Sequence, residues 1–260
     1  MTLKVFRFSN LNVFSISSEY CVLTNGRAEI LRDKMHKILR KEGYFVKRKM
    51  DLDHCHQLQI MILPSRELKV SLVKLEENSY YGQLISPYAG GFTKIADNKE
   101  APSRAFKKLV EAQEVLGKKI QDSEVLVDLG ACPGGWSYVG RTQNASVIAI
   151  DRSEVRDDLL KDPKVTFLQR DAFKYLTDEP VDWVVSDIIC APERILELLQ
   201  LWVHSEHCNN FVFTIKFKGI EGYSILSEFR KFIKDHKQYR IILRQLNVNK
   251  NEVTIMGSKN

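Results

Sequence analysis

A glycine-rich segment and two strand-end carboxylates are the residues whose types and spacing most clearly indicate chemistry. The segment, Asp-Leu-Gly-Ala-Cys-Pro-Gly-Gly-Trp at 128–136, follows an apolar run and leads into a helical pattern. Ligands of open α/β sheets bind at the carboxyl ends of strands, and glycines there let a ligand approach the backbone closely. The spacing is not Gly-x-Gly-x-x-Gly and lacks Gly-Lys-Ser/Thr, which disfavours a dinucleotide site and a phosphate-binding P-loop.

Two aspartates follow the next two predicted strands. Asp151 closes one strand, where a carboxylate can accept hydrogen bonds from ribose hydroxyls, and Asp171 could accept one from an adenine amine. With the glycine loop they suit an adenosine that carries a cation better than one that carries phosphates. The alternative, a tight turn at 134–135 with both aspartates capping helices, is disfavoured because the three features fall on successive strands.

The elements that must position these residues form a regular pattern after about residue 98. Apolar runs predict strands at 125–129, 146–150, 165–168, 183–186 and 210–215. Helical segments, notably 193–204 and 223–235, separate most of them, which implies a mainly parallel sheet covered on both faces. Two closing strands, 239–246 and 253–256, are joined by a polar turn as a hairpin, so the last strand is antiparallel. The fold class is α/β with a seven-stranded sheet.

The amino-terminal part has a different texture and predicts a small α+β domain. Period-two and apolar runs indicate strands at 13–16, 58–63 and 68–73. Helical spacing relates Ile30, Met35, Ile38 and Leu39. A linker is expected at 97–102, with Ser103 as the N-cap of a helix that Gly117 terminates. The predicted domains are 1–97 and 98–260.

Composition and charge narrow the class of protein. Hydrophobic residues make up 44% of the 260 residues, which is enough for a core. No apolar run approaches the roughly 18 residues of a membrane span, and no secretory signal is recognisable, so we expect a cytoplasmic protein. The net charge of +6 favours an anionic partner, because a polyphosphate chain releases counterions when basic residues approach it. The five scattered cysteines predict reduced thiols, and we expect no bound metal.

Two motifs resemble those of the FtsJ/RrmJ-like ribose 2′-O-methyltransferases. They are the segment at 128–136 and Ser-Arg-Ala-Phe-Lys-Lys-Leu at 103–109, which is similar to that family's Ser-Arg-x-x-x-Lys-Leu entry helix. With Ala-Pro-Ser-Arg upstream, the pattern is most similar to the RlmM branch, which acts on large-subunit ribosomal RNA. The resemblance implies a Rossmann-like methyltransferase sheet, S-adenosylmethionine as cofactor and RNA as partner. The residues expected at the cofactor are Asp128, Gly130, Ala131, Pro133, Gly134, Gly135, Trp136, Asp151, Asp171 and Asp187.

The resemblance also implies a catalytic Lys-Asp-Lys-Glu tetrad. Carried over by motif, its members are Lys108, directly before Leu109, then Asp187 and Lys216 at two strand ends, and Glu252 at the start of the last strand. Topology supports the last three independently, because parallel strands end, and an antiparallel strand begins, at the same sheet edge. Charged groups that converge there are costly unless they pair and do chemistry.

The implied mechanism is an in-line displacement in which a ribose 2′-hydroxyl attacks a methyl carbon on a positively charged sulfur. A hydroxyl is a poor nucleophile, so a base helps. A lysine can serve only if its pKa falls well below about 10.4, and burial or a nearby like charge lowers it. We assign Lys216 as the base and Lys108 as the second positive charge that orients the hydroxyl. Asp187 and Glu252 would hold the lysines.

Basic residues outside this tetrad could form a track for RNA phosphates. The candidates are Arg40, Lys47, Arg48, Lys49, Arg104 and Lys107, and the alternative is a solvated charged face. By resemblance, the amino-terminal part could be a reduced THUMP-like RNA-binding domain. Two departures concern the target: Asp187 precedes Ile-Ile-Cys-Ala-Pro rather than Met-Ala-Pro, and the amino-terminal part is shorter than in RlmM enzymes. Methylation of a messenger-RNA cap or transfer RNA, and a non-catalytic RNA-binding protein, are the alternative functions.

Overall fold

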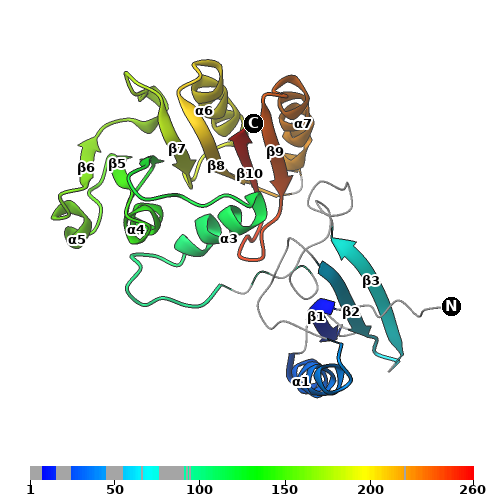
Figure 1. Cartoon of the computed structure of the whole chain (residues 1–260). Coiled ribbons are helices and arrows are strands. Elements are labelled where there is room, and N and C mark those ends of the chain that lie inside the picture. Colours follow the sequence, from blue (N-terminus) through cyan, green and yellow to red (C-terminus); the bar gives the residue numbers. More distant parts are fainter. Residues whose placement is uncertain are drawn as a thin grey trace. The chain divides into compact units, whose positions relative to one another are not determined.

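The chain divides into two compact units, residues 1–94 and 95–260 (Figure 1). The structure, a computed structural model, describes residues 8–15, 25–44, 55–65, 67–75, 91, 93, 95–219 and 221–260. The division lies just before the linker that the sequence predicts at 97–102. No helix among the described residues has both the length and the hydropathy needed to cross a membrane.

The larger unit is built on a seven-stranded sheet with the order β6-β5-β4-β7-β8-β10-β9. Its strands are β4 (Val125–Leu129), β5 (Ser146–Asp151), β6 (Val165–Gln169), β7 (Val181–Ser186), β8 (Cys208–Lys216), β9 (Tyr239–Arg244) and β10 (Glu252–Lys259). Neighbours from β6 to β8 are parallel, whereas β10 is antiparallel to both β8 and β9. The predicted α/β class and the antiparallel last strand are confirmed. Because β10 inserts between β8 and β9, its first residue, Glu252, pairs with the last residue of β8, Lys216.

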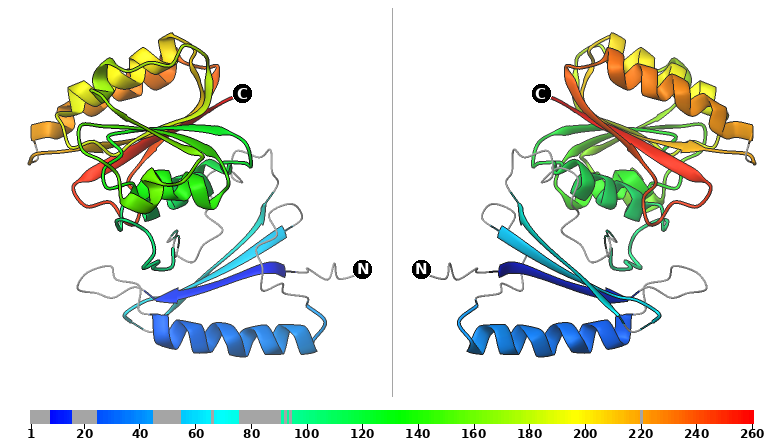
Figure 2. Two further views of the ribbon diagram at one scale, coloured as in Figure 1. Left: turned by 90° about the vertical axis from the view of Figure 1, so that its left-hand side faces the viewer. Right: turned by 90° about the vertical axis from the view of Figure 1, so that its right-hand side faces the viewer.

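Helices cover both faces of this sheet (Figure 2). They are α3 (Phe106–Leu116), α4 (Gly135–Thr142), α5 (Asp157–Leu160), α6 (Pro192–His204) and α7 (Leu226–Asp235), with 3-10 turns η2 (Ala172–Lys174) and η3 (Glu221–Ile225). One apolar core joins α3, α4 and α5 to the sheet, and a second joins α6 and α7 to the opposite face. The central strands are buried on both sides, which explains why their sequences are nearly continuous apolar runs.

Two helix starts differ from the sequence-based predictions. Ser103 is not an N-cap, because residues 101–105 form turns and α3 begins at Phe106 without a side-chain cap. The hydroxyl of Ser103 instead occupies the space that a side chain at Gly135 would need. The helix predicted from residue 223 begins at Leu226, after η3. The end of α3 is as predicted, since Gly117 adopts the left-handed conformation there.

The smaller unit contains a three-stranded sheet and one long helix. Its elements are β1 (Phe8–Ser15), α1 (Asn25–Lys41), β2 (Cys55–Ile62) and β3 (Leu68–Leu75). Strand β2 pairs parallel with β1 and antiparallel with β3. Met35 and Leu39 of α1 pack on the core of this unit, but Ile30 and Ile38 are about 60% exposed, so only part of the predicted apolar set is buried.

Candidate active site

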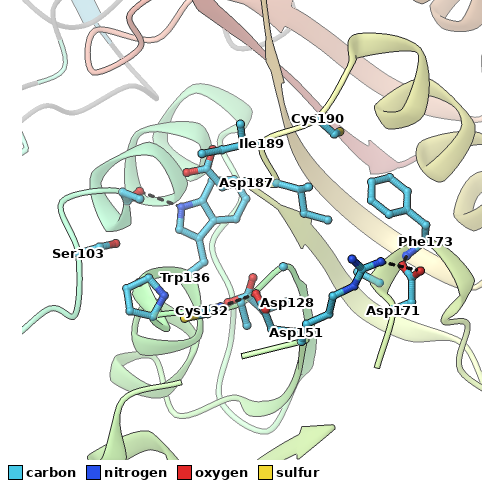
Figure 3. Close-up of a pocket in the computed structure, with 18 of the residues that line it drawn as sticks. Ser103, Asp128, Cys132, Trp136, Asp151, Asp171, Phe173, Asp187, Ile189 and Cys190 are labelled. Carbon is cyan, nitrogen blue, oxygen red and sulfur yellow. Dashed lines mark hydrogen bonds and ion pairs between the residues drawn. The ribbon is translucent and has the colours of Figure 1, made fainter. Parts of the chain in front are cut away.

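A cavity of about 610 Å³ lies at the carboxyl ends of the parallel strands (Figure 3). Its lining comes from the ends of β4, β5 and β8, from the segments that follow β4, β5, β6 and β7, and from the turn before α3. The volume falls in the range of small-molecule sites, which are about 300–1,000 Å³. All the residues expected at the cofactor line this cavity except Gly134.

The glycines of the loop after β4 make room for protein neighbours. Gly130 has φ +76, and a Cβ there would clash with the side chain of Ile188. Gly134 has φ +106, and a Cβ there would clash with Leu159, which packs behind the loop. Such positive φ angles favour glycine. The glycines therefore let the loop fold tightly against the chain around it. The sequence predicts glycine here for close approach of a ligand, and the structure adds close approach of protein side chains.

Asp128 is the deepest carboxylate of the site. It is 2% exposed, and its Oδ2 accepts hydrogen bonds from the backbone N and the Oγ of Ser137, at 2.8 and 2.7 Å. Burial raises the pKa of Asp128 to about 7, although both bonds from Ser137 oppose the shift. Asp128 thus ties the end of β4 to the first turn of α4 and places an ionisable group in the wall of the cavity.

The two strand-end aspartates are also bonded by backbone amides. Asp151 accepts a hydrogen bond of 2.9 Å from the backbone N of Cys132, which joins the end of β5 to the glycine loop. Asp171 accepts one of 3.0 Å from the backbone N of Phe173 and caps η2. This bond is the main cause of the lowered pKa of Asp171, and Arg152 adds to it. Asp171 therefore does cap a short 3-10 turn, while it also lines the cavity.

The four residues of the predicted tetrad lie together at the same sheet edge. Lys108 Nζ lies 3.0 and 3.2 Å from the two carboxylate oxygens of Asp187 and 2.7 Å from Glu252 Oε1. Lys216 Nζ lies 3.0 Å from Asp187 Oδ1 and 2.6 Å from the Asp187 backbone oxygen. Two cations therefore share one carboxylate oxygen. The side chains of all four residues are only 10–20% exposed, so water screens these ion pairs weakly.

The two lysines of this cluster have different surroundings. Lys108, in the first turn of α3, directs its ammonium at three carboxylate oxygens. Lys216 directs its ammonium at two oxygens, both of Asp187, and it lines the cavity together with Asp187. Neither Lys108 nor Glu252 is among the lining residues. An ammonium has three donor positions. Among the described residues two positions of Lys216 have partners, which leaves one for a molecule in the cavity.

The predicted RNA-binding residues fall into three groups. Lys107 forms an ion pair of 2.6 Å with Asp97, so its charge is partly used within the protein. Arg104 is exposed in the turn before α3, and Arg40 is exposed in the last turn of α1, in the other unit. The remaining three, Lys47, Arg48 and Lys49, lie outside the described residues.

Several lining residues were not anticipated from the sequence. They are Ser103, Ala105, Cys132, Arg152, Arg170, Ala172, Phe173, Ile188, Ile189 and Cys190. Most lie one to three positions beyond a strand end. Their place directly after predicted strands could therefore have identified them as lining residues. Cys132 and Cys190 are free thiols, as is Cys208. Within the described part of the chain, no group of three or more His, Cys, Asp or Glu side chains could hold a metal ion.

Most of the larger unit matches one protein family. The family model described as FtsJ-like methyltransferase matches residues 101–257. A Ribosomal RNA large subunit methyltransferase M from Psychromonas ingrahamii is 33% identical over 182 residues, covering 65% of this chain and 50% of its own length. Its counterpart from Hahella chejuensis is 31% identical over 195 residues, covering 73% and 48%. The chain thus spans about half the length of these curated relatives.

A similar solved structure supports the fold of the larger unit and nothing about its function. It comes from Streptococcus thermophilus and is assigned by its name to the hemolysins. It superposes with a TM-score of 0.51 at 20% identity, covering 64% of this chain and 70% of that one.

Proposed function

This chain belongs to the FtsJ-like methyltransferase family, and on that premise we propose that it methylates a ribose 2′-hydroxyl of large-subunit ribosomal RNA in the cytoplasm. The observation that carries the proposal is the carboxylate of Asp187, which is shared by Lys108 and Lys216 at the rim of a cavity with a glycine-loop wall. The curated relatives that act on large-subunit ribosomal RNA support the choice of substrate class.

The lining of the cavity fits S-adenosylmethionine. When bound, this cofactor supplies an electrophilic methyl carbon on a positively charged sulfur. Asp128, Asp151 and Asp171 give the cavity three carboxylates, which suit a cationic nucleoside. A cation beside the buried Asp128 would favour its ionised form over the protonated form that burial favours. The loop at 130–133 and the ring of Phe173 complete the walls that would hold the nucleoside.

The lysines divide the remaining work. Lys216 lines the cavity and contacts two oxygens of Asp187, which leaves the third position on its nitrogen for the substrate. We assign the neutral amine of Lys216 the role of accepting the proton from the ribose hydroxyl, because the lone pair at that position can take a proton. Lys108 has its three donor positions directed at Asp187 and Glu252. Its proposed role is to fix Asp187, which in turn orients Lys216. Such a positioned base typically contributes about 10²–10⁴-fold to the rate.

Mapping the methyl group tests this function. The full chain is incubated with methyl-labelled S-adenosylmethionine and, separately, with unmodified large-subunit ribosomal RNA, transfer RNA and capped messenger RNA. We expect label only in the large-subunit RNA, at one linkage that becomes resistant to alkali because its 2′-hydroxyl is blocked. Label on a base, label in another RNA, or no transfer to any of the three would contradict the proposal.

A further inference from the structure

Two exposed large apolar side chains of the larger unit follow the strands that lead to Asp187 and Lys216. Among the described residues of 95–260, three such side chains are exposed: Ile189 at 85%, Tyr223 at 40% and Leu201 at 38%. Leu201 lies on α6. The other two follow strands that end in the catalytic cluster, since Ile189 comes after β7 and Asp187, and Tyr223 comes after β8 and Lys216. Single exposed apolar residues are ordinary, but these two lie beside the groups proposed to react.

Ile189 is turned outward by the packing of its neighbour. The side chain of Ile188 fills the space above Gly130, where a Cβ would clash with it. Ile189 is the next residue, and it lines the rim of the cavity beside Asp187 (Figure 3). Since Ile188 anchors the segment on the glycine loop, the position of Ile189 is set by the fold.

Tyr223 is held firmly in place from beneath. Its ring contacts Phe217 edge-on, with 4.8 Å between centroids, and its hydroxyl donates to Asn251 Oδ1. Asn251 in turn donates from Nδ2 to the Phe217 backbone oxygen at 2.9 Å, and the Asn251 backbone oxygen accepts from Phe217 N at 3.0 Å. Phe217 directly follows Lys216. The hydroxyl of Tyr223 is therefore used within the protein, and the exposed part of the residue offers the ring for an outside contact.

We propose that Ile189 and Tyr223 contact the base of the target nucleotide and hold its ribose against Lys216. This inference rests on the proposed function. A 2′-hydroxyl that reaches Lys216 brings the base of the same nucleotide to within one sugar ring of the site. Unpaired RNA bases are bound by stacking on aromatic rings and by apolar contact, which are tolerant of base identity. An aromatic side chain and an aliphatic one, on two adjacent strand ends, provide such contacts.

Four variants of the full chain test the inference. The probe is unmodified large-subunit ribosomal RNA transcribed in vitro, and the readouts are KM for RNA, kcat and the Kd for S-adenosylmethionine. We expect Ile189→Ala and Tyr223→Ala each to raise the KM for RNA by about tenfold, because stacking of one base is worth about 5- to 150-fold in affinity. Cofactor Kd should stay within about twofold. Leu201→Ala is the matched control, and Tyr223→Phe keeps the ring while it removes the bond to Asn251.

The outcomes separate this inference from the function beneath it. A wild-type chain that methylates no RNA overturns both. A wild-type chain that methylates RNA, with Ile189→Ala and Tyr223→Ala indistinguishable from Leu201→Ala, overturns only the nucleotide contact. If Tyr223→Phe is as damaging as Tyr223→Ala, or if either alanine variant also loses cofactor affinity and melts early, the residues act on the fold, and the contact is again refuted.

Discussion

The carboxylates along the sheet edge that carries the cavity have two different kinds of hydrogen-bond partner. In the half built from β4, β5 and β6, the partners are mainly backbone amides: Ser137 N for Asp128, Cys132 N for Asp151 and Phe173 N for Asp171. In the half built from β7, β8 and β10, the partners are ammonium groups, with Lys108 and Lys216 bound to Asp187 and Lys108 bound to Glu252.

The two kinds of partner suit different tasks, namely binding a ligand in the first half and proton transfer in the second. A backbone amide at a turn has a fixed direction and does not exchange its proton during a reaction, so the first half forms a shaped wall. A lysine carries a full charge and can gain or lose a proton. The half proposed to hold the cofactor is therefore built from carboxylates bonded to backbone amides, and the half proposed to transfer a proton is built from charged side chains that meet across the fold.

Among the predicted changes, removal of the proposed base should have the largest effect on the rate of methyl transfer. We expect Lys216→Ala to lower the rate of methyl transfer by about 10²–10⁴-fold, because the hydroxyl loses its proton acceptor. Binding of labelled cofactor should change little, since the amide-bonded half is untouched. Single-turnover kinetics and equilibrium binding measure the two quantities. Lys218→Ala, an exposed lysine two positions further along, is the control. A Lys216→Ala variant that turned over at the wild-type rate would show that Lys216 is not the base.

The pH dependence of the free energy of unfolding tests the buried carboxyl of Asp128 in the cavity wall. Burial raises the pKa of Asp128 from 3.8 to about 7, so the folded chain binds a proton between about pH 4 and 7 that the unfolded chain does not. The free energy of unfolding should therefore fall as pH rises through this window, by up to about 4 kcal/mol from this group. Asp128→Asn keeps an oxygen acceptor for Ser137 and removes the titration, which should flatten the slope.

Urea unfolding at a series of pH values measures this slope. Asp171→Asn is the opposing control, because the pKa of Asp171 is lowered and its contribution is lost as pH falls. If Asp128→Asn left the profile unchanged, the carboxyl of Asp128 would not be the buried titrating group described above.

A smaller effect is expected where the two halves touch, at Gly130 beneath Ile188. Gly130→Ala should lower the free energy of unfolding by about 1–3 kcal/mol more than Gly117→Ala. Both glycines have positive φ, but a Cβ at Gly117 meets nothing within 4 Å, whereas one at Gly130 clashes with Ile188. The same destabilisation in both variants would mean that backbone strain, and not the contact between the halves, sets the cost. Denaturant titration of the two variants distinguishes these results.

Local patterns predicted the elements of the larger unit well and their fine details less well. The apolar run at 125–129 is a strand, and Gly117 ends α3, since each depends on neighbouring residues alone. Ser103 misled because its hydroxyl packs against Gly135, which lies far along the chain, and does not cap a helix. Lys107 forms an ion pair with Asp97 in the preceding linker, and its role at RNA stays a prediction. For Ser103, a contact far outside the local sequence window decided the outcome.

The sequence by itself determined the kind of sheet and the residue types at its strand ends, because hydrophobic periodicity and glycine or proline preferences act over a few residues. Tertiary structure decided which of those residues touch. Lys108 meets Glu252 only because α3 packs on the sheet and β10 inserts between β8 and β9. Strand order follows from burying both faces of the sheet at once, and that requirement involves the whole unit and is not written in any single segment.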